Sequence, residues 1–503
     1  MQQEVDLFVI GGGVNGAGIA RDAAGRGLKV MLVEQGDLAG ATSSSSSKLI
    51  HGGLRYLENY EFGLVRESLL ERERLWKVAP NLITPLRFVL PHHKGLRPAF
   101  VLRLGLFLYD HIGGRKLLPA TKRLNLKNHA TGGPLAEGFS TGFEYSDCWV
   151  DDARLVVMNA LGAQELGAEI LTRHTFLSGK REDGHWVISV KTDAGEIETV
   201  KAGILVNAGG PWVDKALSAC SVGSKNESSV RLVKGSHIIV PKLFEHDRAY
   251  TFQNADGRVI FTIPYEDNYT LIGTTDTPFE GDPYSAAADE QEIDYLCNAA
   301  SEYFSDAIKP ETVVWHYSGV RPLYDDGAES ASKATRDYVL ALDQTAEQAP
   351  LLSIYGGKVT TYRRLAEEVL EKLEPFAEFE RGPWTDGAPL PGGDLPGRED
   401  PKGALHDFIA HVETSYPWLP AELARRYAHS YGTRTPDLIG DATSMAAMGQ
   451  GFGAGLTERE AKFLIETEFA KSAEDILWRR SKLGLQMSEA ERAAFTEWFA
   501  ALP

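Results

Sequence analysis

Val9-Ile10-Gly11-Gly12-Gly13-Val14-Asn15-Gly16-Ala17-Gly18, near the start of this 503-residue chain, is the stretch that decides the fold. Residues 6–10 predict a buried strand, since the four residues after Asp6 are apolar; the glycines predict a tight turn, and residues 17–25 predict a helix. A second strand is expected over 30–33, and Glu34 follows it directly. Together these segments predict a βαβ unit whose helix begins at the turn.

The glycine turn is a candidate dinucleotide site. Gly11 permits the turn, Gly13 lets the backbone approach a pyrophosphate, and Gly16 lets helix and strand pack closely. Glu34 follows about twenty residues later, where its carboxylate can accept a hydrogen bond from a ribose 2′-OH. Glycine turns are common, so the motif gains weight only from the strand, helix and acid around it. A carboxylate here disfavours the 2′-phosphate of NADP and leaves FAD or NAD.

Composition limits the class of protein. With 43% hydrophobic residues the chain can bury a large core, and its length suggests about two or three domains. The net charge of −18 argues against nucleic-acid binding, because no overall positive field attracts phosphates. Cys148, Cys220 and Cys297 lie far apart, so we expect reduced structural thiols and no metal site. We also expect no signal peptide and no spanning helix.

Residues 41–56, ATSSSSSKLIHGGLRY, permit two interpretations. Five consecutive serines are typical of a flexible linker. Their place just after the acidic residue instead favours a loop whose hydroxyl groups line the phosphates and ring of a cofactor. The HGG turn at 51–53 would let the backbone approach a flat ring closely. We therefore expect this stretch to line the cofactor.

Residues 87–127 carry a net positive charge in a chain that is negative overall, with nine lysines and arginines against one acid, Asp110. Within them, residues 99–109 are apolar with basic flanks, as expected for a helix that lies on an anionic lipid surface. A buried helix with basic loops is the alternative.

Two later segments are expected to return to the first sheet. Residues 203–207 form a predicted buried strand, which would bring Ala208 and Gly209 against the cofactor. Residues 196–200 are expected to belong to a separate meander. A strand over 351–354 leads through a second glycine turn into a helix, whose positive end suits the polar edge of a flavin.

Two blocks of sequence resemble the signatures of the FAD-dependent, respiratory glycerol-3-phosphate dehydrogenase family: IGGGVNGAGIARDAAGRG at 10–27 and GGKVTTYRRLA at 356–366. The blocks SSSSSKLIHGGLRYLE, VKGSHIIVP, IGTTDTP and SGVRPL are similar to further parts of the same family. The resemblance covers about residues 1–370 well, and length with a helical tail extends it to the whole chain.

The resemblance implies FAD as cofactor, sn-glycerol 3-phosphate as donor, and ubiquinone or menaquinone as acceptor. It also implies a cytoplasmic protein attached to the inner face of the cytoplasmic membrane, without a nucleic-acid partner. The helical last part could pair two chains into a homodimer.

The predicted fold class is α/β. We expect an FAD-binding doubly wound, glutathione-reductase-like domain, an inserted antiparallel-sheet substrate domain that faces the membrane, and a helical C-terminal domain. The boundaries are 1–80, 145–230 and 331–385 for the FAD-binding domain, 81–144 and 231–330 for the substrate domain, 386–400 for a linker, and 401–503 for the C-terminal domain.

Oxidation of a secondary alcohol by a flavin needs a base and a cationic cradle for the phosphate. His237 is the candidate base, since an imidazole titrates near neutral pH. A histidine in such a strand would more often be structural, and the resemblance favours the catalytic role. Arg55 and Arg321 are the strongest candidates for the phosphate, with Tyr56 and Arg336 as supporting donors.

Lys358 completes the predicted catalytic set of His237, Arg321 and Lys358. It follows two glycines, and a cation there would reach the flavin pyrimidine edge or the substrate oxygen. The predicted cofactor-binding residues are Gly11, Gly12, Gly13, Asn15, Gly16, Glu34, Gln35, Thr42, Ser43, Ser44, Ser45, Lys48, Leu49, His51, Gly52, Ala208, Gly209, Trp212, Gly357, Lys358, Val359 and Thr360.

Three other functions stay open at this point. A soluble NAD-dependent dehydrogenase would lack a bound yellow chromophore, and a related flavin-dependent oxidase would release hydrogen peroxide. A membrane-surface scaffold that binds a nucleotide would show no turnover.

Overall fold

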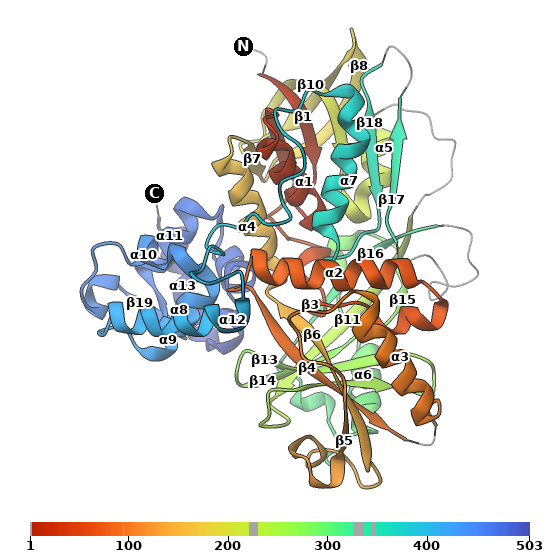
Figure 1. Cartoon of the computed structure of the whole chain (residues 1–503). Helices are drawn as coiled ribbons and strands as arrows, with labels where there is room; N and C mark the ends of the chain where they lie inside the picture. Colours follow the sequence, from red (N-terminus) through yellow and green to blue (C-terminus); the bar gives the residue numbers. More distant parts are fainter. Residues whose placement is uncertain (1–2, 94, 221–229, 326–336, 345–347, 503) are drawn as a thin grey trace.

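The computed structural model describes residues 3–93, 95–220, 230–325, 337–344 and 348–502. Arg336 lies outside these ranges. Figure 1 shows two lobes, each built on a large sheet, with a helical C-terminal part packed against them. No helix formed by these residues is long and apolar enough to cross a membrane.

The first sheet begins with the predicted βαβ unit: β1 (Gln3–Ile10), α1 (Val14–Gly25) and β2 (Val30–Glu34). Its central strands run parallel in the order β18-β10-β1-β2-β7. The remaining bounds are β7 (Glu169–Thr172), β10 (Ile197–Asn207), β18 (Leu351–Tyr355) and the antiparallel edge strand β17 (Val339–Asp343). A doubly wound nucleotide-binding sheet is thereby confirmed.

Helices cover one face of this sheet. α1, α4 (Asp152–Glu165) and α7 (Tyr362–Leu373) pack there on a shared apolar core, because their small and aliphatic side chains are buried against the parallel strands. The other face carries β8 (Thr175–Glu182), β9 (His185–Lys191) and α5 (Val213–Ala219).

The separation expected between residues 196–200 and 203–207 is wrong. Both stretches belong to the single strand β10, whose first half also pairs antiparallel with β9. The strand stays continuous because β1 pairs with it on both sides of the expected separation, from Gln3 opposite Val200 to Ile10 opposite Asn207.

The second sheet is mostly antiparallel, in the order β15-β11-β14-β13-β12-β4-β6-β3, with β16 beside β11 and β5 beside β6. Its bounds are β3 (Leu49–Ile50), β4 (Ile83–His92), β5 (Lys122–Asn125), β6 (Thr141–Val150), β11 (Val230–Pro241), β12 (Ala249–Gln253), β13 (Val259–Tyr265), β14 (Tyr269–Gly273), β15 (Thr277–Pro278) and β16 (Trp315–Tyr324). The boundary expected at 144/145 falls inside β6, which is one strand of this sheet. The division into domains otherwise stays a prediction.

The two faces of the second sheet have different neighbours. Helix α6 (Glu290–Ser301) packs on one face, against alternate residues of β11 such as Ile238. Helices α2 (Phe62–Val78) and α3 (Ala99–Ile112) pack on the opposite face, which also carries Ile239. His237 is two residues from Ile239 and therefore shares the second face.

Strand register continues this face across the sheet. His237 on β11 pairs with Gly273 on β14, Gly273 pairs with Phe261 on β13, and Phe261 pairs with Thr251 on β12. On the other side His237 pairs with Tyr317 on β16. A Cβ on Gly273 would overlap the imidazole ring, so only glycine leaves room for the histidine there.

The C-terminal part has its own apolar core and contains α8 (Pro401–Ser415), α9 (Ala421–Tyr431), α10 (Thr435–Ile439), α11 (Glu458–Thr467), α12 (Leu483–Gln486) and α13 (Glu489–Ala500). A short hairpin of β19 (Gly451–Gly453) and β20 (Leu456–Thr457) adds to the expected helices. A buried ion pair between Arg154 and Glu468 joins this part to α4. The predicted linker is packed and not free, since Leu390 and Leu395 within it are buried.

Candidate functional site

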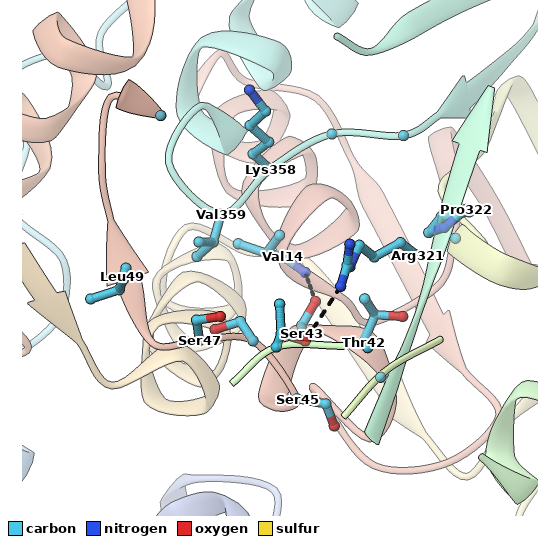
Figure 2. Close-up of a pocket in the computed structure, with 18 of the residues that line it drawn as sticks. Val14, Thr42, Ser43, Ser45, Ser47, Leu49, Arg321, Pro322, Lys358 and Val359 are labelled. Atoms are coloured by element: carbon cyan, nitrogen blue, oxygen red, sulfur yellow. Dashed lines mark hydrogen bonds between the residues drawn. The ribbon is translucent and has the colours of Figure 1, made fainter. Parts of the chain in front are cut away.

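A cavity of about 990 Å³ lies where the two sheets meet. It is lined by the glycine turn after β1, the serine loop after β2, the end of β10, the second sheet and the turn before α7. Figure 2 shows labelled side chains from four of these segments, including Ser43, Ser47, Arg321 and Lys358. Segments that are far apart in the sequence therefore share one site.

The glycine turn has the close packing that its motif predicts. Gly11 has a φ of +104°, and a Cβ there would overlap the carbonyl of Ala208. A Cβ on Gly16 would overlap the carbonyl of Gly11, so the helix approaches the turn as closely as backbone allows. Ser43 Oγ accepts a hydrogen bond of 3.0 Å from Val14 N, drawn as a dashed line in Figure 2.

Glu34 ends β2 at the wall of the same cavity. Its carboxylate accepts hydrogen bonds of 2.7 Å from Gly12 N and from Gly36 N. Burial raises the pKa of Glu34, and the two amide donors oppose that rise. The site therefore has glycine backbone without side chains on one side and a fixed hydrogen-bond acceptor on the other. This arrangement fits a dinucleotide such as FAD.

Sequence analysis missed several residues at this end. Tyr284, from the second lobe, donates a hydrogen bond of 3.3 Å to Glu34 and lies against Trp212 with ring centroids 4.6 Å apart. No local signal marks Tyr284, because it follows Glu34 by 250 positions in the sequence. His174 and Phe176 also line the cavity. Their position at the edge where β7 ends could have indicated them, since ligands bind at the carboxyl ends of parallel strands.

His237 lies at the other end of the site and is 3% exposed. Its Nε2 lies 2.9 Å from Ser47 Oγ, and its ring stacks on Tyr317 with centroids 4.9 Å apart. Its Nδ1 has no hydrogen-bond partner among the described residues. Burial lowers the pKa of His237 well below 6.5, and the nearby charges of Lys48 and Arg321 lower it further. A neutral imidazole at pH 7 can accept a proton.

Arg321 enters the cavity from β16, next to His237 on the same sheet face. It donates hydrogen bonds of 3.2 Å to Asp276 and 3.0 Å to the carbonyl of Thr275. These contacts hold the guanidinium in place, so the blocks VKGSH, IGTTDTP and SGVRPL meet at one point.

A buried carboxylate supports this corner from behind. Glu292 on α6 forms an ion pair of 2.8 Å with Lys234, and it accepts hydrogen bonds from Ser236 at 2.9 Å and from Thr275 at 2.8 Å. Glu292 therefore ties β11, the strand of His237, to Thr275, whose carbonyl accepts a hydrogen bond from Arg321.

Lys358 lies opposite, in the turn before α7, with its ammonium 4.0 Å from the ring centroid of Tyr56. Arg55 also lines the cavity and is exposed. Arg336, the fourth candidate for the phosphate, lies outside the described residues.

Most predicted cofactor residues line the cavity, and six do not: Gly12, Gly16, Ser44, Lys48, Gly52 and Thr360. Lys48 is the clearest case, because its Nζ forms a fully buried ion pair of 2.8 Å with Asp152. Gly52 N donates to Tyr109 Oη at 2.8 Å, and Thr360 Oγ1 accepts from His51 N at 3.2 Å. These residues support the walls of the site from behind.

Helix α3 borders the cavity, and its lining residues include Leu104 and Leu108 as well as the buried Leu106. Its outer face carries Phe100, Leu104, Phe107 and Leu108, which are 74%, 59%, 54% and 40% exposed. Of the two interpretations of residues 99–109, the structure excludes a fully buried helix. Tyr60, at 80% exposed, and Phe62, at 41% exposed, lie in the adjoining segment and extend the apolar character.

The three cysteines are free and buried, and His, Cys, Asp and Glu side chains do not gather into a metal-binding group in the described part of the chain.

Comparison with known proteins adds independent findings. Residues 6–363 match the family described as FAD dependent oxidoreductase, and residues 383–502 match the C-terminal domain of alpha-glycerophosphate oxidase. The chain is 53% identical to D-erythritol 1-phosphate dehydrogenase of Brucella abortus, covering 98% of this chain and 97% of that protein. It is 46% identical to aerobic glycerol-3-phosphate dehydrogenase of Escherichia coli, with coverage of 98% and 97%.

A glycerol-3-phosphate dehydrogenase of Pseudomonas aeruginosa is 48% identical, over 98% of this chain and 94% of that protein. Among solved structures, the glycerol-3-phosphate dehydrogenase of Bacillus halodurans complexed with FAD matches with a TM-score of 0.77 at 25% identity, covering 99% of this chain and 94% of that one.

Proposed function

Because the chain belongs to the FAD-dependent oxidoreductase family, and within it to the glycerol-3-phosphate dehydrogenases, we propose that it oxidises sn-glycerol 3-phosphate to dihydroxyacetone phosphate. FAD is the cofactor. The observation that carries the proposal is the convergence of His237, Arg321 and Lys358 on the cavity that the glycine turn borders.

Each of the three side chains has a separate role in this reaction. His237 takes the hydroxyl proton of C2, since burial keeps its pKa low and its imidazole therefore neutral. Arg321 binds the phosphate through its fixed guanidinium, with Arg55 as a second cation at the same cavity. Lys358 stabilises negative charge that develops during the transfer.

FAD, when bound, supplies the hydride acceptor for the hydrogen on C2. The alcohol loses one proton and one hydride, so a carbonyl forms at C2 and the phosphate ester is unchanged. The walls around His237 exclude water, which keeps the proton acceptor neutral and close to the substrate.

The test is to add sn-glycerol 3-phosphate without oxygen to the purified holoprotein and to record its visible spectrum. Bleaching of the flavin band near about 450 nm is expected. A band that persists would reject this substrate. Hydrogen peroxide formed during aerobic turnover without another acceptor would favour the oxidase over the dehydrogenase.

A second candidate substrate is D-erythritol 1-phosphate, because the relative that is 53% identical carries that name. The sheet face that carries His237 supports it, since Thr251 and Gln253 line the cavity further along the same face. The ratio of kcat/KM for sn-glycerol 3-phosphate to kcat/KM for D-erythritol 1-phosphate decides between the two substrates.

The electrons are proposed to pass to ubiquinone or menaquinone at the inner face of the cytoplasmic membrane. The apolar outer face of α3 supports this, because it is exposed and also borders the cavity. Exposed Arg97 and Arg103 at this face suit anionic headgroups. A homodimer stays a prediction, which sedimentation velocity measures directly.

A further inference from the structure

Ser47 is a serine that the proposed chemistry does not yet use. Its Oγ lies 2.9 Å from Nε2 of His237, the proposed base. Ser47 also lines the cavity and stands in the same loop as Ser43, which bonds the start of α1. It therefore contacts the proposed base directly.

The loop around Ser47 is clamped by a buried carboxylate. Asp152, the first residue of α4 and 0% exposed, accepts hydrogen bonds from Ser46 N at 3.2 Å and Ser46 Oγ at 2.7 Å. It also forms the ion pair with Lys48, on the other side of Ser47. The two flanking residues are thereby fixed to one acceptor, which leaves Ser47 little freedom to move.

Tyr317 ties this clamp to the base itself. Its hydroxyl donates a hydrogen bond of 2.8 Å to the carbonyl of Ser46, and its ring stacks on His237. The ammonium of Lys48 lies 5.1 Å from the centroid of the same ring. The loop and the imidazole are thus held in one relative position from two directions.

We propose that Ser47, held by Asp152 through Ser46, is a positioning residue that holds the neutral imidazole of His237 in the orientation its role as base requires. A neutral imidazole carries one N–H and one lone pair, and a hydroxyl can accept from the N–H or donate to the lone pair. In either case the bond between Ser47 Oγ and Nε2 fixes the rotation of the ring about its side-chain bonds. The inference rests on the proposed function, since it assigns His237 as base.

The test compares the variants Ser47→Ala, Ser47→Thr, Ser46→Ala and the double Ser46→Ala/Ser47→Ala. Flavin reduction by sn-glycerol 3-phosphate is followed by anaerobic stopped flow, which separates the reduction rate constant from the substrate Kd. FAD content, thermal unfolding and the ¹⁵N shifts of the His237 ring are measured alongside, with His237→Asn identifying those shifts. Ser301→Ala is the matched control, because Ser301 is likewise half-buried and its hydroxyl bonds a helix carbonyl on α6.

Ser47→Ala is expected to lower the reduction rate constant about tenfold, as one lost hydrogen bond of about 1–1.5 kcal/mol predicts, with Kd within twofold. Ser47→Thr, which keeps the hydroxyl, is expected to restore most of the rate. The double variant is expected to be no slower than Ser47→Ala alone, because Ser46 acts through Ser47.

Three outcomes would overturn the inference: a Ser47→Ala rate within twofold of the wild type, unchanged ring ¹⁵N shifts, or additive losses in the double variant. Equal losses of rate, FAD content and thermal stability would assign Ser47 a structural role instead. Absence of reduction in the wild type would reject the proposed function and is distinct from all of these results.

Discussion

The hydroxyl of Tyr284, in the second lobe, donates a hydrogen bond of 3.3 Å to Oε1 of Glu34, the residue that ends β2 in the first lobe. Glu34 therefore holds the two lobes together at the nucleotide end, in addition to its two backbone donors. A cofactor ribose would meet an acceptor whose position is already fixed.

Replacing Glu34 by Ala is expected to weaken FAD binding about 10–100-fold, since hydrogen bonds to a charged acceptor contribute about 1.5–3 kcal/mol. Titration of the apoprotein with FAD, followed by tryptophan fluorescence, measures the Kd. Tyr284→Phe is the control and should change Kd by less than about threefold, because it leaves the carboxylate and its backbone donors in place. Tight binding by Glu34→Ala would show that the carboxylate does not hold the ribose.

His237→Asn is expected to lower the flavin reduction rate by about a hundredfold to ten-thousandfold while FAD stays bound, because a general base contributes about 10²–10⁴-fold. In the wild type, kcat/KM should stay level from pH 8 down to about pH 6.5. The sign follows from the pKa of His237, which burial lowers well below 6.5, so the neutral base persists into acid. A decline of kcat/KM that begins above pH 7 would contradict this assignment.

The buried pair of Arg154 and Glu468 joins α4 to the C-terminal part with both side chains fully buried. Glu468→Gln should lower the free energy of unfolding by about 3–5 kcal/mol, because it leaves a buried guanidinium without its charge partner. Urea titration measures this change. Asp441→Asn, at an exposed pair with Arg459, is the matched control and should leave stability unchanged.

The same pair predicts a dependence of stability on pH. Burial alone would raise the pKa of Glu468, but Arg154 and Arg434 outweigh it, and the pKa is lowered below 4.5. A lowered carboxyl pKa stabilises the folded state fully above about pH 4.5, and this contribution is lost as the pH falls through the lower folded value. Glu468→Gln should therefore flatten the acid limb of the stability curve, and an unchanged limb would contradict the prediction.

The outer face of α3 predicts attachment to vesicles of phosphatidylglycerol and phosphatidylethanolamine. Phe100→Glu/Phe107→Glu should weaken partitioning about a hundredfold, because each side chain gains about 1.5–3 kcal/mol on burial and neither lines the cavity. Turnover with a soluble dye as acceptor should not change. Ile197→Glu replaces a residue that is 69% exposed on β10 and should bind vesicles like the wild type. If both variants bind the vesicles equally in a flotation assay, α3 is not the contact surface.

Much of the first lobe could be predicted from sequence because its signals are local. The turn at Gly11, the acid Glu34 and the second glycine turn at Gly357 each follow a buried strand, and parallel strands that end at one sheet edge must share a site. The helical nature of residues 99–109 followed from their apolar pattern, whereas the sequence left open whether the helix lies exposed on a lipid surface or is buried.

The contacts between lobes could not be predicted, because they depend on how one sheet docks on the other. The hydrogen bonds Tyr284–Glu34 and Ser47–His237 join residues that are far apart in the chain, and no pattern in the sequence links the two members of either pair. Lys48 was expected to bind the cofactor because of its position in the serine loop. A buried ammonium requires an acidic partner, however, and Lys48 forms its ion pair with Asp152.

The cavity has one consequence for biosynthesis, since its walls come from segments spread between Ile10 and Val359. A ribosome must complete about seven tenths of the 503 residues before the last wall segment exists. The nascent βαβ unit offers a glycine turn, but neither His237 nor Lys358 to enclose what binds there. Enclosure of the flavin is therefore a late event in the synthesis of each chain.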